Sequence, residues 1–419
     1  MKKGGAGVGN AKRKRFGAYV AQLRRDARKS QRQLAETLCR ISETASVTRH
    51  EISRWERGER VPAVWLPALA TALDVPLDSL ERSAAHARGE DVGTASRSPA
   101  EAFAYFLPDH DVELGPLANH TGRRVGASTA AALADRAHGL RLADDVIAGG
   151  DLLAPALREL NAAVRLYRET THSEETGRSL LSSIGELAQI AGWIASDAGE
   201  HEQAARAYRL GASAAREAGD LALVGNLAGS LAYQLSNTGH EDDGLSLAQA
   251  ALEEAGPDAP AKARALYLDR VAWAHTKAGN TQPAMRALAE AHEAMTAEDT
   301  QESPVWAYWV SPEELDVMDA RVYTELRKPL RAVPLLQEVL SRYDSTHTRE
   351  LALYLSWLAV ALVDANEPEE ATKTARRMLD LSADSASDRT ARRNRIVLTK
   401  LEPHRDIPEV RDLLSTHAA

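Results

Sequence analysis

Apolar residues recur along this chain at the three- and four-residue intervals of amphipathic helices, and no long run of alternating apolar and polar residues predicts a β-strand. The first clear example lies within residues 29–62. Leu34 and Leu38 lie four residues apart and would be buried on one face of a first helix. Ile52 and Trp55 lie three residues apart and would be buried on a second helix. The pattern predicts an all-α fold.

Both of these helices have a sequence signal for their first turn. Ser30 with Gln33 and Thr48 with Glu51 form capping boxes, in which a hydroxyl is followed three residues later by a side chain that reaches back. Two helices therefore begin close together in the sequence. The residues expected on the outer face of the second helix are Arg49, His50, Ser53 and Arg54.

Charge is distributed unevenly along the chain. Residues 1–62 contain 16 Lys and Arg against 6 Asp and Glu, a net charge of +10. Residues 63–419 contain 35 against 54, a net charge of -19. A compact basic domain suits a polyanion, because neutralising phosphates releases condensed counterions, and the same polyanion repels an acidic remainder. The distribution indicates a nucleic-acid-binding N-terminal domain.

Three motifs carry a family resemblance: SQRQLA, VTRHEISRWERG, and a spaced run of Pro62, Leu66, Leu69 and Ala70. Together they resemble the lambda-repressor-like, or XRE-type, regulator domain of five short helices, over residues 16–82. The resemblance implies that the partner is double-stranded DNA. In such domains the second helix of the motif lies in the major groove with its N-terminal residues at base edges.

The resemblance also implies roles for single residues. Arg49 and His50 would reach base edges, and Gln31 would contact a phosphate or a flanking base. Arg54 and Arg57 would lie near the DNA backbone or a further base, whereas Trp55 would be core. The candidate DNA-binding residues are Gln31, Thr48, Arg49, His50, Ser53, Arg54 and Arg57.

Two segments depart from the family pattern or precede it. The stretch between Ala35 and Val47 is longer than the family spacing, so CRISETAS either extends the first helix or bulges toward the DNA. Residues 1–15 are basic and rich in glycine. They are expected to be a flexible arm that follows phosphates or the minor groove, or simply a disordered start.

The rest of the chain divides by composition and periodicity. Residues 83–99 lack apolar periodicity and predict a flexible linker. Residues 100–180 predict a helical connecting region, with a long helix at about Ser128 to Ile147 and a break at Gly149 and Gly150. Residues 386–419 are expected to be capping helices with a polar outer face, as the end of a repeat array requires.

Residues 181–385 contain an internal repeat. Its turn residues, taken as anchors, are separated by 40, 40, 48 and 39 residues and are Gly199, Gly239, Gly279, Arg327 and Asn366. The small residues five positions after and seven before the anchors are Ala204, Gly244, Ala284, Ala332, Ala371, Gly192, Ala232, Ala272, Ala320 and Ala359. Such residues let two antiparallel helices approach closely. The pattern resembles the tetratricopeptide repeat and predicts a solenoid of helical hairpins.

A second column of the repeat suggests a ligand groove. Six positions before the anchors lie Trp193, Tyr233, Trp273, Arg321 and Val360. In tetratricopeptide arrays this position tends to face the concave groove, where rings among amides and charges suit a peptide or an amphiphilic small molecule. The alternative is that the rings form core between repeats. The candidate groove residues are Gln189, Trp193, Asn226, Tyr233, Asn237, Asp269, Arg270, Trp273 and Lys277.

Other chemistry has little support in the sequence. The 13 histidines are scattered without metal-ligand spacing, and Cys39, expected to be a buried apolar residue, is the single cysteine. The longest apolar stretch is too short to span a bilayer, and the N-terminus lacks the apolar region of a signal peptide. We therefore expect a cytoplasmic protein that is not an enzyme, with no cofactor, no metal and no membrane partner.

These features predict a sequence-specific DNA-binding transcriptional regulator. Its repeats would mediate homodimerisation and sense a peptide or small-molecule effector. The layout resembles that of actinobacterial XRE-type regulators with tetratricopeptide repeats and is similar to that of peptide-pheromone receptors. The alternative is an interaction adaptor, in which the repeats recruit a partner protein and DNA binding is secondary.

Overall fold

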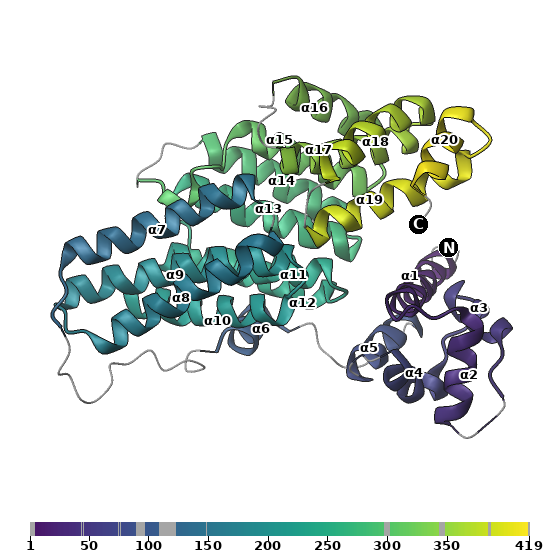
Figure 1. The fold of residues 1–419 in the computed structure, drawn as a ribbon, viewed down its shortest axis with the longest axis horizontal. Coiled ribbons are helices and arrows are strands. Elements are labelled where there is room, and N and C mark those ends of the chain that lie inside the picture. Colours follow the sequence, from purple (N-terminus) through teal and green to yellow (C-terminus); the bar gives the residue numbers. More distant parts are fainter. Residues whose placement is uncertain are drawn as a thin grey trace. The chain divides into compact units, whose positions relative to one another are not determined.

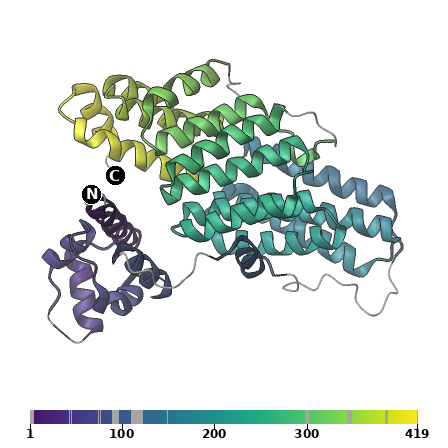
Figure 2. The ribbon, with the colours of Figure 1, turned by 180° about the vertical axis from the view of Figure 1, so that it is seen from behind.

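The computed structural model describes residues 5–88 except 43, 45, 74 and 76, then 97–108, 123–296 except 148, 302–342, 348–383 and 387–417. The chain divides into two compact units, residues 1–96 and 97–419 (Figure 1; Figure 2). Over the described residues both units are helical, with a single isolated β-bridge between Arg124 and Thr171. The predicted all-α fold class, a helix-turn-helix domain followed by an array of helical hairpins, is confirmed.

None of the helices in the described part of the chain is both long enough and apolar enough to cross a membrane.

The first unit packs its helices around one apolar core. In the described residues these helices are α1 (Gly5–Asp26), α2 (Gln31–Ile41), α3 (Arg49–Glu56), α4 (Leu66–Leu73) and α5 (Leu77–Arg88), with a 3-10 turn, η1 (Ala63–Trp65), before α4. The four residues that the sequence pattern assigned to the core, Leu34, Leu38, Ile52 and Trp55, are each at most 2% exposed. The predicted inner faces of α2 and α3 are therefore confirmed.

The two predicted capping boxes differ in the structure. At Ser30 both hydrogen bonds form: the Gln33 amide donates to Ser30 Oγ at 3.2 Å, and the Ser30 amide donates to Gln33 Oε1 at 2.8 Å. At Thr48 only the hydroxyl half forms, because Thr48 Oγ1 accepts from the Glu51 amide while the Glu51 carboxylate pairs with Arg54 at 3.0 Å. A cation one turn later has drawn the carboxylate away from the cap.

Two boundaries of the first unit also differ from the expectation. Residues 5–15 belong to α1, whereas an arm was expected. Glycine explains the close packing at this end, because a Cβ on Gly17 would lie only 2.6 Å from the Trp55 carbonyl oxygen. Helix α5 continues to Arg88, into the expected linker 83–99, of which residues 89–96 lie outside the described residues.

The segment CRISETAS does not extend α2, which ends at Ile41. Cys39 lies in the last turn of α2 and is half-buried, where full burial was expected. Its thiol donates to the Val47 carbonyl at 3.3 Å, so it ties the end of α2 to the start of the motif's second helix.

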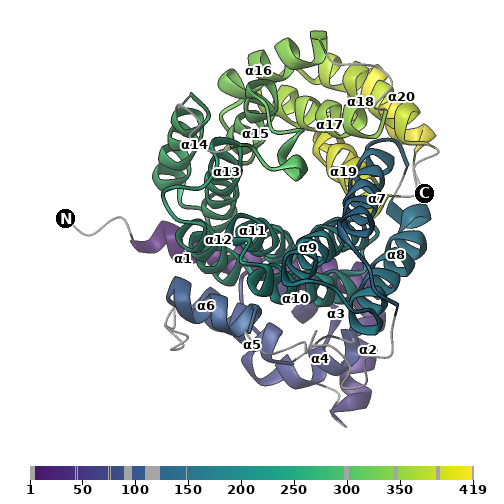
Figure 3. The same cartoon turned by 90° about the vertical axis from the view of Figure 1, so that its left-hand side faces the viewer.

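The second unit begins with α6 (Pro99–Phe106), α7 (Ala127–Val146) and α8 (Gly149–Glu169). The hairpins that follow are α9 (Glu174–Asp197) with α10 (His201–Ala218), α11 (Leu221–Asn237) with α12 (Glu241–Ala255), α13 (Ala261–Ala278) with α14 (Thr281–Thr296), α15 (Pro312–Glu325) with α16 (Pro329–Arg342), and α17 (Thr348–Asp364) with α18 (Pro368–Ser382). Helices α19 (Asp388–Leu401) and α20 (Pro408–Thr416) end the unit. Figure 3 shows the hairpins following one another around a ring.

The five anchors that were read from the sequence mark the hairpin turns. Their φ angles are all positive: 83° at Gly199, 90° at Gly239, 83° at Gly279, 53° at Arg327 and 64° at Asn366. The ten small residues at fixed offsets from them are all buried. The third interval, from Gly279 to Arg327, is longer because residues 297–311 stand between α14 and α15, and they include a 3-10 turn, η2 (Val305–Ala307). The predicted register of the hairpins is therefore confirmed.

The ring closes on itself. Helix α7, which precedes the hairpins, contacts α17 of the last hairpin as well as α9 of the first. The helices that face the middle of the ring are α7, α9, α11, α13, α15, α17 and α19, and their partners form its outer layer (Figure 3). The concave side of the array is therefore the inner wall of a ring.

We predict that Gly244→Ala lowers the free energy of unfolding of the repeat unit by about 2 kcal/mol. A Cβ at this position would lie 2.8 Å from the Ser236 amide nitrogen and 2.9 Å from the Ala232 carbonyl oxygen, and backbone atoms cannot move aside cheaply. Urea unfolding followed by tryptophan fluorescence measures the change.

Gly139→Ala is the matched control, because nothing lies within 4 Å of a Cβ at that exposed position of α7. Here helix propensity should raise stability by up to about 1 kcal/mol. Equal effects of the two substitutions would show that the close approach of α11 and α12 does not constrain the hairpin.

Candidate functional site

The outer face of α3 begins with two side chains that no other described residue engages. Arg49 and His50 are exposed and form no hydrogen bond or ion pair within the described part of the chain. Thr48, also exposed, caps the helix through its hydroxyl. The first turn of α3 therefore presents a guanidinium and an imidazole that are available to an external partner.

The remaining cations of α3 are held in a surface network of ion pairs. Arg54 pairs with Glu51 at 3.0 Å and with Glu59 at 3.5 Å. Arg57 donates to Glu59 at 2.7 Å and to Ser53 Oγ at 2.7 Å, and its hydrogen bond to Glu59 holds the pKa of that carboxyl below its usual range. A phosphate would have to compete with Glu59 for both arginines, so they are oriented before any partner arrives.

Gln31 is fixed by a partner that the sequence analysis did not consider. Its side-chain amide donates to Glu56 Oε2 at 2.7 Å. Arg24 also binds this carboxylate, through Nε to Oε1 at 2.6 Å and Nη2 to Oε2 at 3.2 Å. Glu56 therefore links α1, α2 and α3. The Arg24 and Glu56 side chains are only 14% and 9% exposed, and 32 residues separate them in sequence.

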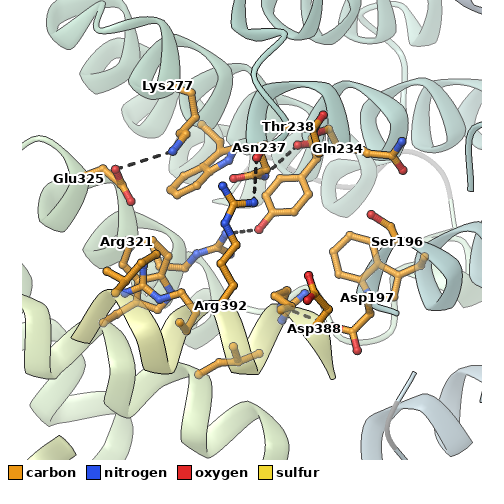
Figure 4. Close-up of a pocket in the computed structure, with 18 of the residues that line it drawn as sticks. Ser196, Asp197, Gln234, Asn237, Thr238, Lys277, Arg321, Glu325, Asp388 and Arg392 are labelled. Carbon is orange, nitrogen blue, oxygen red and sulfur yellow. Dashed lines mark hydrogen bonds and ion pairs between the residues drawn. The ribbon is translucent and has the colours of Figure 1, made fainter. Parts of the chain in front are cut away.

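The interior of the repeat ring contains two neighbouring cavities, of about 140 Å³ and 330 Å³. Of the nine candidate groove residues, those on the smaller cavity are Trp193, Tyr233, Asn237, Trp273 and Lys277 (Figure 4). Those on the larger cavity are Gln189, Trp193, Asn226 and Arg270. Asp269 lines neither; it is 3% exposed and lies 3.4 Å from the Arg270 guanidinium. The structure thus brings eight of the nine residues to one enclosed region.

The aromatic column continues across the hairpins as a ladder. Ring centroids are 5.7 Å apart for Trp193 and Tyr233, 6.0 Å for Tyr233 and Trp273, and 5.8 Å for Trp273 and Trp357. Val360, the expected fifth member, lies in the core and lines neither cavity. Trp357, one turn earlier on α17, takes its place. The rings both line the cavities and pack between repeats.

Arginines interleave with these rings and set the electrostatic potential of the interior. The Arg270 guanidinium lies 4.7 Å from the Tyr233 ring centroid, and that of Arg321 lies 4.8 Å from the Trp273 centroid. Burial by itself would raise the pKa of Tyr233, but the charges of Arg321, Arg389 and Arg270 bring that pKa below its usual value. A phenol that is easier to ionise despite burial reports a positive environment.

Three arginines of α19, Arg389, Arg392 and Arg393, also belong to this region, which the expectation of a capping helix did not include. Arg393 is 7% exposed, lies 3.5 Å from the Trp357 ring centroid and donates to Ser356 Oγ. Arg392 donates to the Asn237 carbonyl at 3.0 Å and reaches across the smaller cavity in Figure 4. Because the ring returns to its start, α19 lies beside α9 and α11 and turns its cations inward.

The long third interval of the repeat, between Gly279 and Arg327, supplies part of the larger cavity. Trp306, Tyr308 and Trp309 all line it. Tyr308 Oη donates to Asp145 of α7 at 2.7 Å, and burial with this contact raises the Tyr308 pKa above its usual range. The 48-residue spacing of two anchors, where the other spacings are 39 or 40, is the sequence signal for this segment.

Comparison with known proteins identifies the type of domain in the first unit. A family model described as a helix-turn-helix domain matches residues 15–83. No curated protein and no solved structure matches the chain. The match covers α2 and α3 with their flanking helices, so the N-terminal unit contains a helix-turn-helix domain and indicates a DNA-binding regulator.

We predict that Glu56→Ala destabilises the helix-turn-helix domain by about 3 kcal/mol, because it leaves Arg24 and Gln31 without their shared acceptor in a largely buried place. Hydrogen–deuterium exchange of peptides from α1 to α5, measured in the full chain, reports the loss locally.

Glu59→Ala is the control, since it removes a carboxylate from exposed ion pairs and should leave exchange nearly unchanged. Similar exchange in both variants would show that the three-helix link at Glu56 is not stabilising.

Proposed function

We propose that the protein is a sequence-specific DNA-binding transcriptional regulator, without catalytic activity, whose repeat unit mediates dimerisation and senses an effector. The observation that carries the proposal is the first turn of α3. There Arg49 and His50 lie at the N-terminal end of the second helix of the motif, with no competing partner in the described residues. This is the end of the helix that such motifs direct at base edges.

The cations of α3 are suited to two kinds of DNA contact, because some of them are ion-paired and others are not. A free Arg49 guanidinium is suited to bidentate hydrogen bonds with guanine O6 and N7, which discriminate between bases. Arg54 and Arg57 share the acceptor Glu59 and are suited to phosphates, which position the domain without reading sequence. The Gln31 side chain is held by its hydrogen bond to Glu56 and would contact the DNA backbone.

The repeat unit supports an effector role more than an adaptor role. We assign its hairpins to the tetratricopeptide type on their turns and small-residue columns. Because α7 and α17 close the ring, the concave column faces cavities inside the ring instead of an open groove. Such an interior suits a small ligand or a short peptide, whereas an adaptor needs an accessible surface for a folded partner.

We expect Arg49→Ala to weaken binding to a selected operator duplex by about 1–3 kcal/mol and to leave binding to a random duplex nearly unchanged. Arg57→Ala should weaken both. Fluorescence anisotropy at matched salt, on a duplex obtained by selection from random sequence, measures the four affinities. If Arg49→Ala weakened both duplexes equally, the base-reading role would be rejected.

We also expect two copies on each operator, because a single motif contacts few base pairs and useful specificity needs half-sites about one helical turn apart. Light scattering of the full chain should give a dimer. Cross-links between labelled and unlabelled copies should join lysines of the repeat unit, such as Lys328 or Lys373. A monomer at tens of micromolar, or cross-links confined to residues 1–96, would contradict the proposal.

A further inference from the structure

We propose that the smaller cavity of the repeat ring binds a small organic anion, a flat or aromatic acid whose carboxylate is received by Arg321 and Arg392. The inference rests on the proposed function, because it gives the chemical class of the effector. It depends on three observations: the charge of the wall, unsatisfied donors within it, and an apolar surface beside them.

The wall of this cavity is cationic although the unit around it is acidic. Residues 97–419 contain 33 Lys and Arg against 49 Asp and Glu, a net charge of -16. Among the described residues that line the cavity the cations are Lys277, Arg321, Arg389, Arg392 and Arg393. The carboxylates there are Asp197, Glu325 and Asp388. The local excess of two positive charges, against the sign of the whole unit, favours an anionic ligand.

Two buried donors on this wall have no acceptor among the described residues. Arg321 donates through Nη2 to Tyr233 Oη at 2.6 Å, but its Nε is buried and unpaired. Trp273 is 3% exposed, and its indole Nε1 is also buried and unpaired. Both groups donate only, so they require an oxygen acceptor. A carboxylate provides acceptor lone pairs for more than one donor.

Arg392 provides a third donor that can change partner. Its side chain is exposed on α19, and its guanidinium donates to the Asn237 carbonyl across the cavity (Figure 4). A charged carboxylate is a stronger acceptor than a neutral carbonyl. Binding would therefore draw Arg392 from the end of α11 onto the ligand, which links occupancy of the cavity to the closing helix of the ring.

The apolar part of the wall fits the body of such an acid. Tyr233, Trp273, Trp357, Leu353 and Ile396 line the same cavity. The cavity volume of about 140 Å³ suits a small molecule, and the larger cavity adjoins it through four shared residues: Trp193, Arg321, Tyr354 and Arg389. A ligand longer than one ring system would extend into that second space.

The test is calorimetric titration of the full chain with matched acids and amides. Naphthalene acetate is compared with the neutral naphthalene acetamide, and N-acetyltryptophan, which mimics the C-terminus of a peptide, with its amide. We expect each acid to bind about tenfold or more tightly than its amide, because the amide cannot supply a charged acceptor. If naphthalene acetate binds more tightly, the ligand class is a free aromatic acid. If N-acetyltryptophan binds more tightly, it is the C-terminus of a peptide. Equal binding of acid and amide, or no binding of either acid, would overturn the proposal.

Variants locate the site. Arg392→Gln should weaken the acids about tenfold and leave the amides unchanged, whereas Arg395→Gln, an exposed arginine of the same helix that lines neither cavity, should change nothing. Trp273→Phe removes the indole N–H together with part of the ring surface, so it should weaken the acids more than the amides, and that difference separates the lost donor from the lost apolar contact. Equal effects of Arg392→Gln and Arg395→Gln would place binding outside the cavity.

Two further measurements distinguish a carboxylate site from a general anion site, and the cavity from the DNA-binding unit. Inorganic phosphate that displaces the acids at equal concentration would show a general anion site and overturn the assignment to a carboxylate. DNA binding of the same preparations, measured by anisotropy, tests the proposed function independently. If the chain binds DNA but neither acid, the carboxylate site is rejected and the proposed function stands. If it binds the acids but not DNA, the proposed DNA-binding function is rejected.

Discussion

The repeat unit depends on the close approach of paired helices at their turns. Each hairpin requires a left-handed residue at its corner and a small residue on either side, as at Gly239, Ala232 and Gly244. A single hairpin cannot bury its apolar face alone, so its neighbours must cover it. Repeating the same geometry turns the array until α17 meets α7. The enclosed interior is therefore a consequence of how tightly each pair packs.

That interior contains an unusual number of arginines, and their burial has an electrostatic cost that the surrounding groups offset. Arg393 is 7% exposed, and burial lowers its pKa to about 10. The face of Trp357 and the oxygen atoms of Ser356 partly replace its water. Arg270 likewise lies beside Asp269, whose own pKa is raised by burial. A wall of this kind is stabilised further by any anion that adds acceptors.

In the helix-turn-helix unit, ion pairs and hydrogen bonds fix the helices, while some of the cations on those helices have no partner among the described residues. Glu56 binds Arg24 and Gln31, so a single carboxylate orients α1 and α2 against α3. Glu51 in the first turn of α3 pairs with Arg54, and Glu59 beyond its end pairs with Arg54 and Arg57, so among the described residues neither carboxylate pairs with Arg49 or His50. The division between oriented and available cations follows from where the carboxylates stand along the chain.

The sequence alone determined the features that depend on neighbours within a turn or two of helix. These include the buried pairs of α2 and α3, the Ser30 capping box, and all five hairpin turns, even where Arg327 and Asn366 replace glycine. The tertiary structure decided what lies across the ring. Trp357 replaced Val360, and Arg389, Arg392 and Arg393 of α19 came to line the interior, because small rotations between successive hairpins accumulate until distant helices meet. The total rotation depends on packing along the whole array, so no short stretch of the sequence indicates it.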